Sequence, residues 1–136
     1  MSRRAAAGLV LLAIDAALLS GCARAVAERV RHRIDENSAA TQVELTVGQV
    51  HEVELTASAG TGYEWTLVSA DPVVAVSKPR TEALDVGRLG GPVAWRFELT
   101  GVKPGPGRVN FALVRPWETG TTPAQTALIS VRVDPQ

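Results

Sequence analysis

From residue 41 onward, apolar and polar residues alternate with a period of two, the pattern of a β-strand that is buried on one face. The alternation comes in short runs, and turn residues such as Gly and Pro separate the runs every 8–12 residues or so. We predict strands at residues 43–47, 51–55, 63–67, 73–76, 93–99, 109–113 and 127–133. The pattern predicts no helix of any length here. It therefore indicates an all-β fold, an antiparallel two-sheet sandwich of about seven strands.

Three aromatic residues lie on the apolar side of alternating runs, and we predict that they form part of the core: Trp65, Trp95 and Phe111. His51 begins another run. We expect it to be a half-exposed strand residue and not a metal or catalytic ligand. A chain of 136 residues is typical of one domain, and we expect a monomer.

Charge and cysteine content exclude several classes of function. The chain has 14 basic and 14 acidic residues, with no basic stripe, so we expect no nucleic-acid partner. It has one Cys and two His, too few for a disulfide framework or a multi-thiolate metal site. No P-loop, catalytic triad or acid/base pair of carboxylates is recognisable. We expect no enzyme activity, no metal and no cofactor.

The first residues have the organisation of an export signal. Arg3 and Arg4 precede a mostly apolar stretch, residues 5–19, which Asp15 interrupts. This stretch is shorter than the roughly 20 residues of a membrane-spanning helix and is typical of a secretory signal. Leu19-Ser20-Gly21-Cys22 resembles the lipobox of bacterial lipoproteins. That resemblance implies cleavage after residue 21, a lipid on Cys22 and a location on the exported side of a bacterial membrane.

Two other interpretations of this segment are a plain signal peptide with an incidental Cys and a buried N-terminal helix. Residues 22–40 follow, rich in Ala and charged residues, and we interpret them as a lipidated Cys and a flexible tether, with a helical turn or two in residues 28–34. Arg29, Arg31 and Arg33 could instead touch lipid head groups. The β-sandwich domain is then expected to occupy residues 41–136.

Three stretches interrupt the strand pattern: residues 58–63, 87–91 and 115–118. Loops held by a rigid sandwich commonly carry binding residues. In the third stretch, Pro116 cannot donate to a central strand ladder, so Arg115-Pro116-Trp117-Glu118 is expected to form a loop. Trp and Arg are enriched at interface hot spots, but Trp117 could also fold back onto the core.

The three stretches together resemble the loops of the chagasin family, whose members carry N-P-T-T-G-[YF], a following strand Trp, a G-x-G-type loop and R-P-W/F. This chain has Ser58-Ala59-Gly60-Thr61-Gly62-Tyr63 before Glu64-Trp65, then Gly87-Arg88-Leu89-Gly90-Gly91, then Arg115-Pro116-Trp117. The order and the separations agree. The resemblance covers roughly residues 43–133.

This resemblance implies an immunoglobulin-like sandwich that reversibly inhibits papain-like cysteine proteases by inserting three loops into the active-site cleft. Gly60, Thr61 and Gly62 would approach the catalytic cysteine. The flanking loops would brace the cleft with these residues: Arg88, Leu89, Gly90, Gly91, Arg115, Pro116 and Trp117. Trp117 would stack on the protease and Arg115 would hydrogen-bond across the interface. Tyr63 is either part of this surface or simply the first core residue of its strand.

The central loop departs from the family pattern, because Ser58, Ala59 and Gly60 stand where the family has Asn, Pro and Thr. Losing Pro predicts a looser loop, and Arg88 and Leu89 could change which protease fits. Two other functions therefore stay open. One is an envelope lipoprotein with the same fold that binds another protein or a carbohydrate. The other is a structural domain without loop function, in which Trp117 would be buried.

Overall fold

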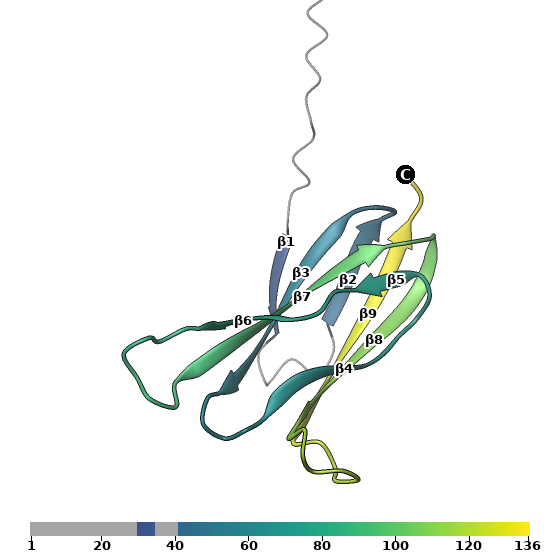
Figure 1. The fold of residues 1–136 in the computed structure, drawn as a ribbon. Helices are drawn as coiled ribbons and strands as arrows, with labels where there is room; N and C mark the ends of the chain where they lie inside the picture. Colours follow the sequence, from purple (N-terminus) through teal and green to yellow (C-terminus); the bar gives the residue numbers. More distant parts are fainter. Residues whose placement is uncertain (1–29, 35–40) are drawn as a thin grey trace, which may run out of the picture.

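The computed structural model describes residues 30–34 and 41–136, and these form nine β-strands in two stacked sheets (Figure 1). The predicted signal segment, Cys22 and the rest of the expected tether lie outside the described residues. The strands are β1 (Val30–Ile34), β2 (Thr41–Thr46), β3 (Val50–Ser58), β4 (Glu64–Ala70), β5 (Val74–Val76), β6 (Arg80–Ala83), β7 (Pro92–Gly101), β8 (Gly105–Val114) and β9 (Gln125–Asp134).

One sheet has the order β1-β3-β7-β5, with β6 also paired to β7, and the other has the order β2-β9-β8-β4. The all-β sandwich is confirmed, and each of the seven predicted strands is present. Most neighbours are antiparallel, as predicted, but β1 runs parallel to β3 and β2 runs parallel to β9. β8 also begins earlier than predicted, because Gly105 and Pro106 already pair with β9, inside the stretch expected to be only a turn.

The sequence missed β1 and β6. A helical turn was predicted where β1 lies, and that prediction is wrong: Val30–Ile34 pairs with β3, with Arg31 opposite Glu52 and Arg33 opposite Glu54. The folded domain therefore begins before residue 41, and the chain that can act as a tether is shorter. β6 is exposed at every residue, so it offered no apolar face to the pattern.

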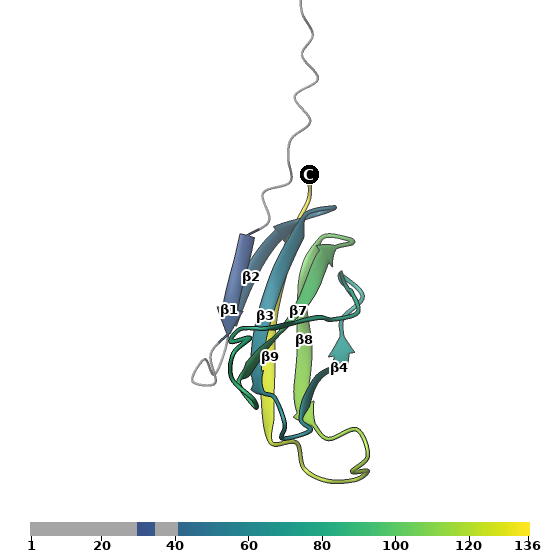
Figure 2. The same ribbon diagram turned by 60° about the vertical axis from the view of Figure 1, so that its left-hand side comes forward.

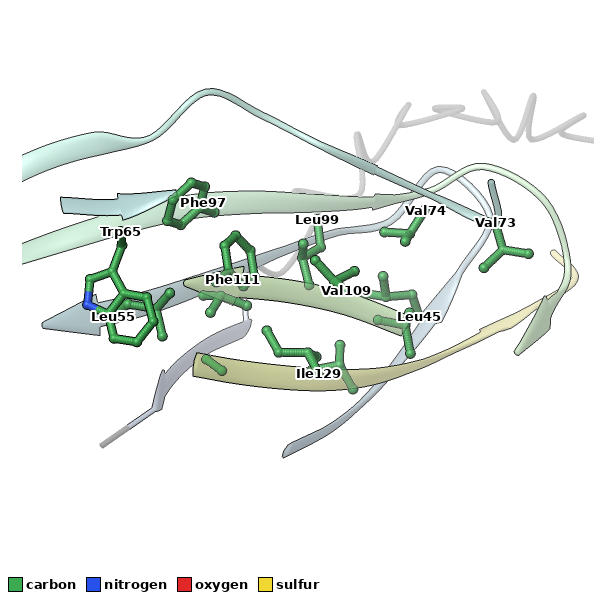
Figure 3. Close-up of a cluster of buried hydrophobic side chains, with 14 of the residues drawn as sticks. Leu45, Leu55, Trp65, Val73, Val74, Phe97, Leu99, Val109, Phe111 and Ile129 are labelled. Atoms are coloured by element: carbon green, nitrogen blue, oxygen red, sulfur yellow. The ribbon is translucent and has the colours of Figure 1, made fainter. Parts of the chain in front are cut away.

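The core fills the space between the two sheets (Figure 3). Phe97 of one sheet faces Phe111 of the other, with ring centroids 4.5 Å apart and ring planes tilted by 47°. Trp65 and Phe111 are buried, as predicted. Trp95 is only partly buried, in contrast to the prediction, because it packs at the margin of the core. Such a tilted aromatic pair stabilises the sandwich beyond its buried area.

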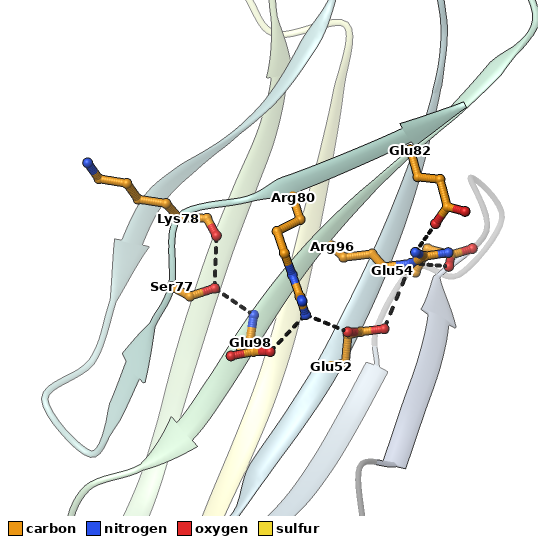
Figure 4. Close-up of polar contacts among 8 residues, drawn as sticks. All are labelled: Glu52, Glu54, Ser77, Lys78, Arg80, Glu82, Arg96 and Glu98. Atoms are coloured by element: carbon orange, nitrogen blue, oxygen red, sulfur yellow. Dashed lines mark hydrogen bonds and ion pairs between the residues drawn. The ribbon is translucent and has the colours of Figure 1, made fainter. Parts of the chain in front are cut away.

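The outer face of the β3–β7 sheet carries a network of charged side chains (Figure 4). Glu52 and Glu54 are buried, although the alternation predicted a polar, outward face for them. Arg96 binds Glu54 at 3.1 Å and also pairs with Glu82, and Arg80 binds Glu52 at 3.1 Å. β6 supplies Arg80 and Glu82, so this strand covers part of the face with charge. His51 is also buried, and the expectation of a half-exposed side chain is wrong.

The connections between strands gather at the two ends of the sandwich. The β3–β4, β6–β7 and β8–β9 connections lie toward one end, and the C terminus lies at the other (Figures 1 and 2). β3 runs toward the three connections, and β1 runs parallel to it, so Val30 lies toward the end that is remote from them. In the described part of the chain, no helix has the length and apolar character needed to cross a membrane.

Candidate functional site

The three predicted loops are the three connections that meet at one end of the sandwich (Figure 2). The central loop follows β3 and ends at β4, which begins at Glu64. The second loop joins β6 to β7, and the third joins β8 to β9. The central loop contacts both of the others, so the loops form one continuous ridge. We call this surface the loop ridge, and it comprises residues 58–63, 84–91 and 115–118.

Backbone atoms join the central loop to the second loop. The amide of Ala59 donates a 2.8 Å hydrogen bond to the carbonyl of Gly91. Gly60 and Gly90 face each other closely enough that a Cβ added at Gly60 would lie 3.7 Å from the Gly90 Cα. Both glycines have positive φ, 82° and 72°, which L-residues with a side chain rarely adopt. The glycine pattern therefore allows two backbones to approach each other at this side of the ridge.

The third loop contacts the central loop through Trp117, whose ring lies against Gly62. A Cβ added at Gly62 would lie 2.2 Å from the Trp117 Cη2 atom, a distance that real Cβ atoms do not reach. Trp117 nevertheless remains 67% exposed. It does not fold back onto the core, and the structural interpretation that required its burial is wrong. One edge of the ring is fixed by the central loop, and the rest is open to a partner.

Arg115 makes a second contact between the third loop and the central loop. Its Nε donates a 3.0 Å hydrogen bond to the carbonyl of Thr61, and its guanidinium lies 4.4 Å from the ring centroid of Tyr63. Its Nη1 binds the Glu118 carboxylate at 3.0 Å. The hydrogen bond to Glu118 raises the pKa of Arg115 above its ordinary value, so the group stays protonated. The side chain expected to hydrogen-bond across an interface is thus already engaged within the chain.

The central loop has internal hydrogen bonds in place of the missing proline. The Thr61 hydroxyl donates to the carbonyl of Ser58 at 2.8 Å, and it accepts a longer bond from the Tyr63 amide at 3.4 Å. Tyr63 packs against the core while its ring supports Arg115. Tyr63 is therefore the first core residue of its strand and also contacts Arg115 of the third loop, while its part in a binding surface stays a prediction.

The second loop exposes apolar side chains to solvent. Leu89 and Val86 are almost fully exposed, at 102% and 92%, and Arg88 lies between them in sequence. Large apolar side chains exposed together at one loop tip are candidates for contact with a partner. Val86 was missed by the sequence analysis, which singled out only residues 87–91 of this loop.

A depression beside Trp117 adds a residue that the sequence analysis assigned to the core. Its lining includes Gly60, Gly62, Trp95 and Trp117. Trp95 shares the inward face of β7 with Phe97 but lies nearer to the loops, so it is only partly covered. Nothing in the sequence indicated that Trp95 lines this depression. Period-two alternation shows which face of a sheet a residue lies on, but not how close it lies to the loop end of the sandwich.

The ridge offers backbone amides, an exposed indole and apolar loop tips. In the described ranges, 30–34 and 41–136, no group of three or more His, Cys, Asp or Glu residues could hold a metal ion. Such an arrangement can serve as a binding surface, with close backbone contacts at its centre and exposed side chains on both flanks.

Comparison with protein families identifies this arrangement. The family model described as "Chagasin family peptidase inhibitor I42" matches residues 44–131, which include all three loops. The chain belongs to the chagasin family. The predicted membership of this family is thereby confirmed, and the chain falls among peptidase inhibitors and not among enzymes. No curated protein sequence matches the chain significantly.

Solved structures show the same fold at low sequence identity. The cysteine protease inhibitor EhICP2 from Entamoeba histolytica is 21% identical, with a TM-score of 0.65 over 79% of this chain and 98% of its own. PbICP-C, solved in complex with falcipain-2, is 24% identical, with a TM-score of 0.64 over 77% and 99%. Amebosin is 22% identical, with a TM-score of 0.60 over 78% and 98%. These likenesses confirm the chagasin-like, immunoglobulin-like sandwich.

Proposed function

We propose that this chagasin-family chain reversibly inhibits papain-like cysteine proteases by inserting its loop ridge into the active-site cleft. The observation that carries the proposal is the contact of the central loop with both flanking loops, with Trp117 fixed against Gly62 yet 67% exposed. Two of the structural relatives support the target class, since EhICP2 is described as a cysteine protease inhibitor and PbICP-C was solved bound to falcipain-2.

The physical argument for this mode of binding begins at the centre of the ridge. A narrow cleft admits backbone more easily than side chains, and residues 60–62 present two glycines around Thr61. Hydrogen bonds within the loop and to Gly91 reduce the conformational freedom that binding would otherwise remove. The central loop would therefore occupy the cleft without supplying any catalytic group.

The flanks of the ridge would supply the anchors. Trp117 presents the open part of its ring on one side, and Trp is among the residue types most enriched at hot spots. On the other side, Leu89 and Val86 present apolar surface with Arg88 between them. This combination favours a protease whose cleft has an apolar wall on the side of the second loop, so the choice of protease would depend on residues 86–89.

The test is inhibition of a panel of papain-like proteases by residues 23–136, which include every residue that the structure describes. We expect competitive inhibition, and we expect Trp117→Ala to raise the inhibition constant by about 30-fold or more, as loss of a hot spot does. Val102→Ala is the matched control, because Val102 is 51% exposed but lies in the β7–β8 turn, remote from the loops. It should leave the inhibition constant unchanged.

A folded domain that inhibits no member of the panel would contradict this proposal. That result would favour the second candidate function, a binding module of the same fold for another envelope protein or a carbohydrate. Inhibition that survives Trp117→Ala but is lost with Val102→Ala would place the binding surface at the wrong end of the molecule.

We further propose that the chain is lipid-anchored through Cys22 on the exported side of a bacterial membrane. Support comes from the basic start, the apolar stretch and the Leu19-Ser20-Gly21-Cys22 sequence. Incorporation of labelled palmitate into the full chain, absent from Cys22→Ala, tests the lipid directly. Export of the unlabelled wild-type chain as a free protein would contradict it.

A further inference from the structure

The Arg115 side chain makes its contacts within the loop ridge, in a structure that contains no partner. The Nε atom is bonded to the Thr61 carbonyl at 3.0 Å, and the Nη1 atom is bonded to Glu118 at 3.0 Å. One face of the guanidinium lies 4.4 Å from the centroid of Tyr63. Thr61 belongs to the central loop and Glu118 to the third loop, so one planar group holds two loops that are far apart in sequence.

Trp117 lies two residues after Arg115, on the same loop, and it contacts the central loop at Gly62. The central loop is therefore held by the third loop at two adjacent points, Thr61 and Gly62. The position of the exposed indole depends on how the third loop lies against the central loop. The hydrogen bond from Arg115 to Thr61 fixes the third loop in that position. Pro116 lies between the two contacts and restricts the backbone that joins them.

Arg88 on the second loop provides the contrast. It is exposed, and the ion pairs found among the described side chains do not include it. The side chain of Arg115 is 35% exposed, and two of its nitrogens are already bonded. The two arginines of the ridge thus differ in kind: one faces solvent and the other is part of the internal framework of the loops.

We propose that Arg115 is a positioning residue, which fixes the central loop and Trp117 in their binding arrangement before the protease arrives. This proposal rests on the proposed inhibitory function, and it replaces the role implied by the family resemblance, in which Arg115 hydrogen-bonds to the protease. A planar guanidinium can donate in two directions and stack on a ring at once, whereas a lysine ammonium cannot. Arg115→Lys therefore keeps the positive charge but removes the combination of two hydrogen bonds and stacking on Tyr63.

The experiment compares the free inhibitor, residues 23–136, with three variants: Arg115→Lys, Arg115→Ala and Arg88→Ala. Amide hydrogen exchange of residues 60–63, measured by NMR without protease, reports the order of the central loop. We expect both Arg115 variants to exchange about tenfold faster there, as loss of one ordering contact implies. Exchange in the core strands and the thermal midpoint should stay close to wild type, and Arg88→Ala should leave the loop amides unchanged.

Kinetics with a protease that the wild type inhibits supply the second readout. Arg115→Lys should lower the rate constant for association with the protease by about the same factor as it raises the exchange rate of the loop amides. The reason is that a smaller fraction of the inhibitor molecules has the central loop in its binding conformation. Tyr63→Leu removes the ring beneath the guanidinium, and its effect on the inhibition constant should not add to that of Arg115→Ala.

Unchanged loop exchange in both Arg115 variants, together with weaker inhibition, would overturn the proposal and make Arg115 a direct contact with the protease. Additive effects of Tyr63→Leu and Arg115→Ala would count against it in the same way. The exchange measurement needs no protease, so wild-type failure to inhibit would remove the proposed function while the exchange result still decides whether Arg115 orders the loop.

Discussion

Two glycines with nearly the same positive φ have opposite surroundings in this chain. Gly62 has φ 75° and Gly120 has φ 76°, so a side chain at either position is strained. A Cβ at Gly62 would meet the Trp117 ring at 2.2 Å, whereas a Cβ at Gly120 would have nothing within 4 Å. The pair separates the cost of the backbone conformation from the cost of displacing the indole.

We predict that Gly120→Ala lowers the free energy of unfolding by about 1–2 kcal/mol, the cost of left-handed backbone. Gly62→Ala should lower it by more, because its added Cβ also displaces the Trp117 ring. Only Gly62→Ala should also move Trp117 away from the central loop and weaken protease inhibition. Chemical denaturation gives the first quantity, and inhibition kinetics give the second. Equal inhibition by the two variants would show that the contact of Trp117 with Gly62 is unimportant for binding.

The residues of the ridge were predictable from the sequence, but their contacts were not. Pro116 and the end of an alternating run placed Arg115 and Trp117 in a loop, and the structure agrees. The bond from Arg115 to Thr61 joins residues 54 apart in the chain. Such a contact depends on the pairing of β4 with β8, which places Glu64 opposite Val114, and local alternation does not encode which strands pair. The sequence therefore indicated the surface, and only the fold shows which side chains hold it together.

At the scale of elements, β1 and β6 show where a period-two pattern fails. β6 carries no apolar stripe, and β1 has just two apolar residues, Val30 and Ile34, too few to mark a half-buried strand. Both flank the outer face of the sheet that contains Glu52 and Glu54. Burial of those two carboxylates was likewise invisible in the sequence, because the pattern did not predict β6, whose Arg80 pairs with Glu52.

The pair between Arg96 and Glu54 is the most buried part of this network. Glu54 is 2% exposed, and the side chain of Arg96 is 20% exposed. We predict that Arg96→Ala lowers the free energy of unfolding by about 3 kcal/mol, because it leaves a buried carboxylate without this cation. Arg132→Ala is the control, since its pair with Asp134 is exposed on both sides and should contribute less than about 1 kcal/mol. Urea denaturation measures both, and equal losses would contradict the argument.

The pH dependence of this contribution follows from the sign of the pKa change. The hydrogen bond to Glu54, with a second to Glu82, raises the pKa of Arg96 above its ordinary value. A cation whose pKa is higher in the folded state stabilises the fold at every pH below its pKa in the unfolded state. This stabilisation is lost only as the pH rises through the pKa of the folded state. Titration of Arg96 should therefore leave stability constant between pH 6 and 8. A difference between wild type and Arg96→Gln that changes over this range would show that another group controls it.

At the scale of the whole molecule, β1 determines how an anchored chain would present its loops. Residues 23–29 separate Cys22 from β1, and a chain of that length spans at most about 25 Å. β1 starts toward the end opposite the loop ridge, and the nine residues of β3 extend about 30 Å toward the ridge. A lipid on Cys22 would therefore hold the molecule by its remote end, and the ridge would face the aqueous side.

We predict that the lipidated chain on vesicles inhibits a soluble protease with an inhibition constant within about twofold of that of residues 23–136, because the anchor leaves the ridge accessible. Deleting residues 23–29 brings the remote end against the bilayer and should change little, since the ridge is still about 30 Å away. Trp117→Ala on the same vesicles is the control for inhibition through the ridge. The contrary result is loss of inhibition on deletion while circular dichroism shows a folded domain. The ridge would then face the membrane, and its access to the protease would depend on the length of residues 23–29 and not on the direction of β1.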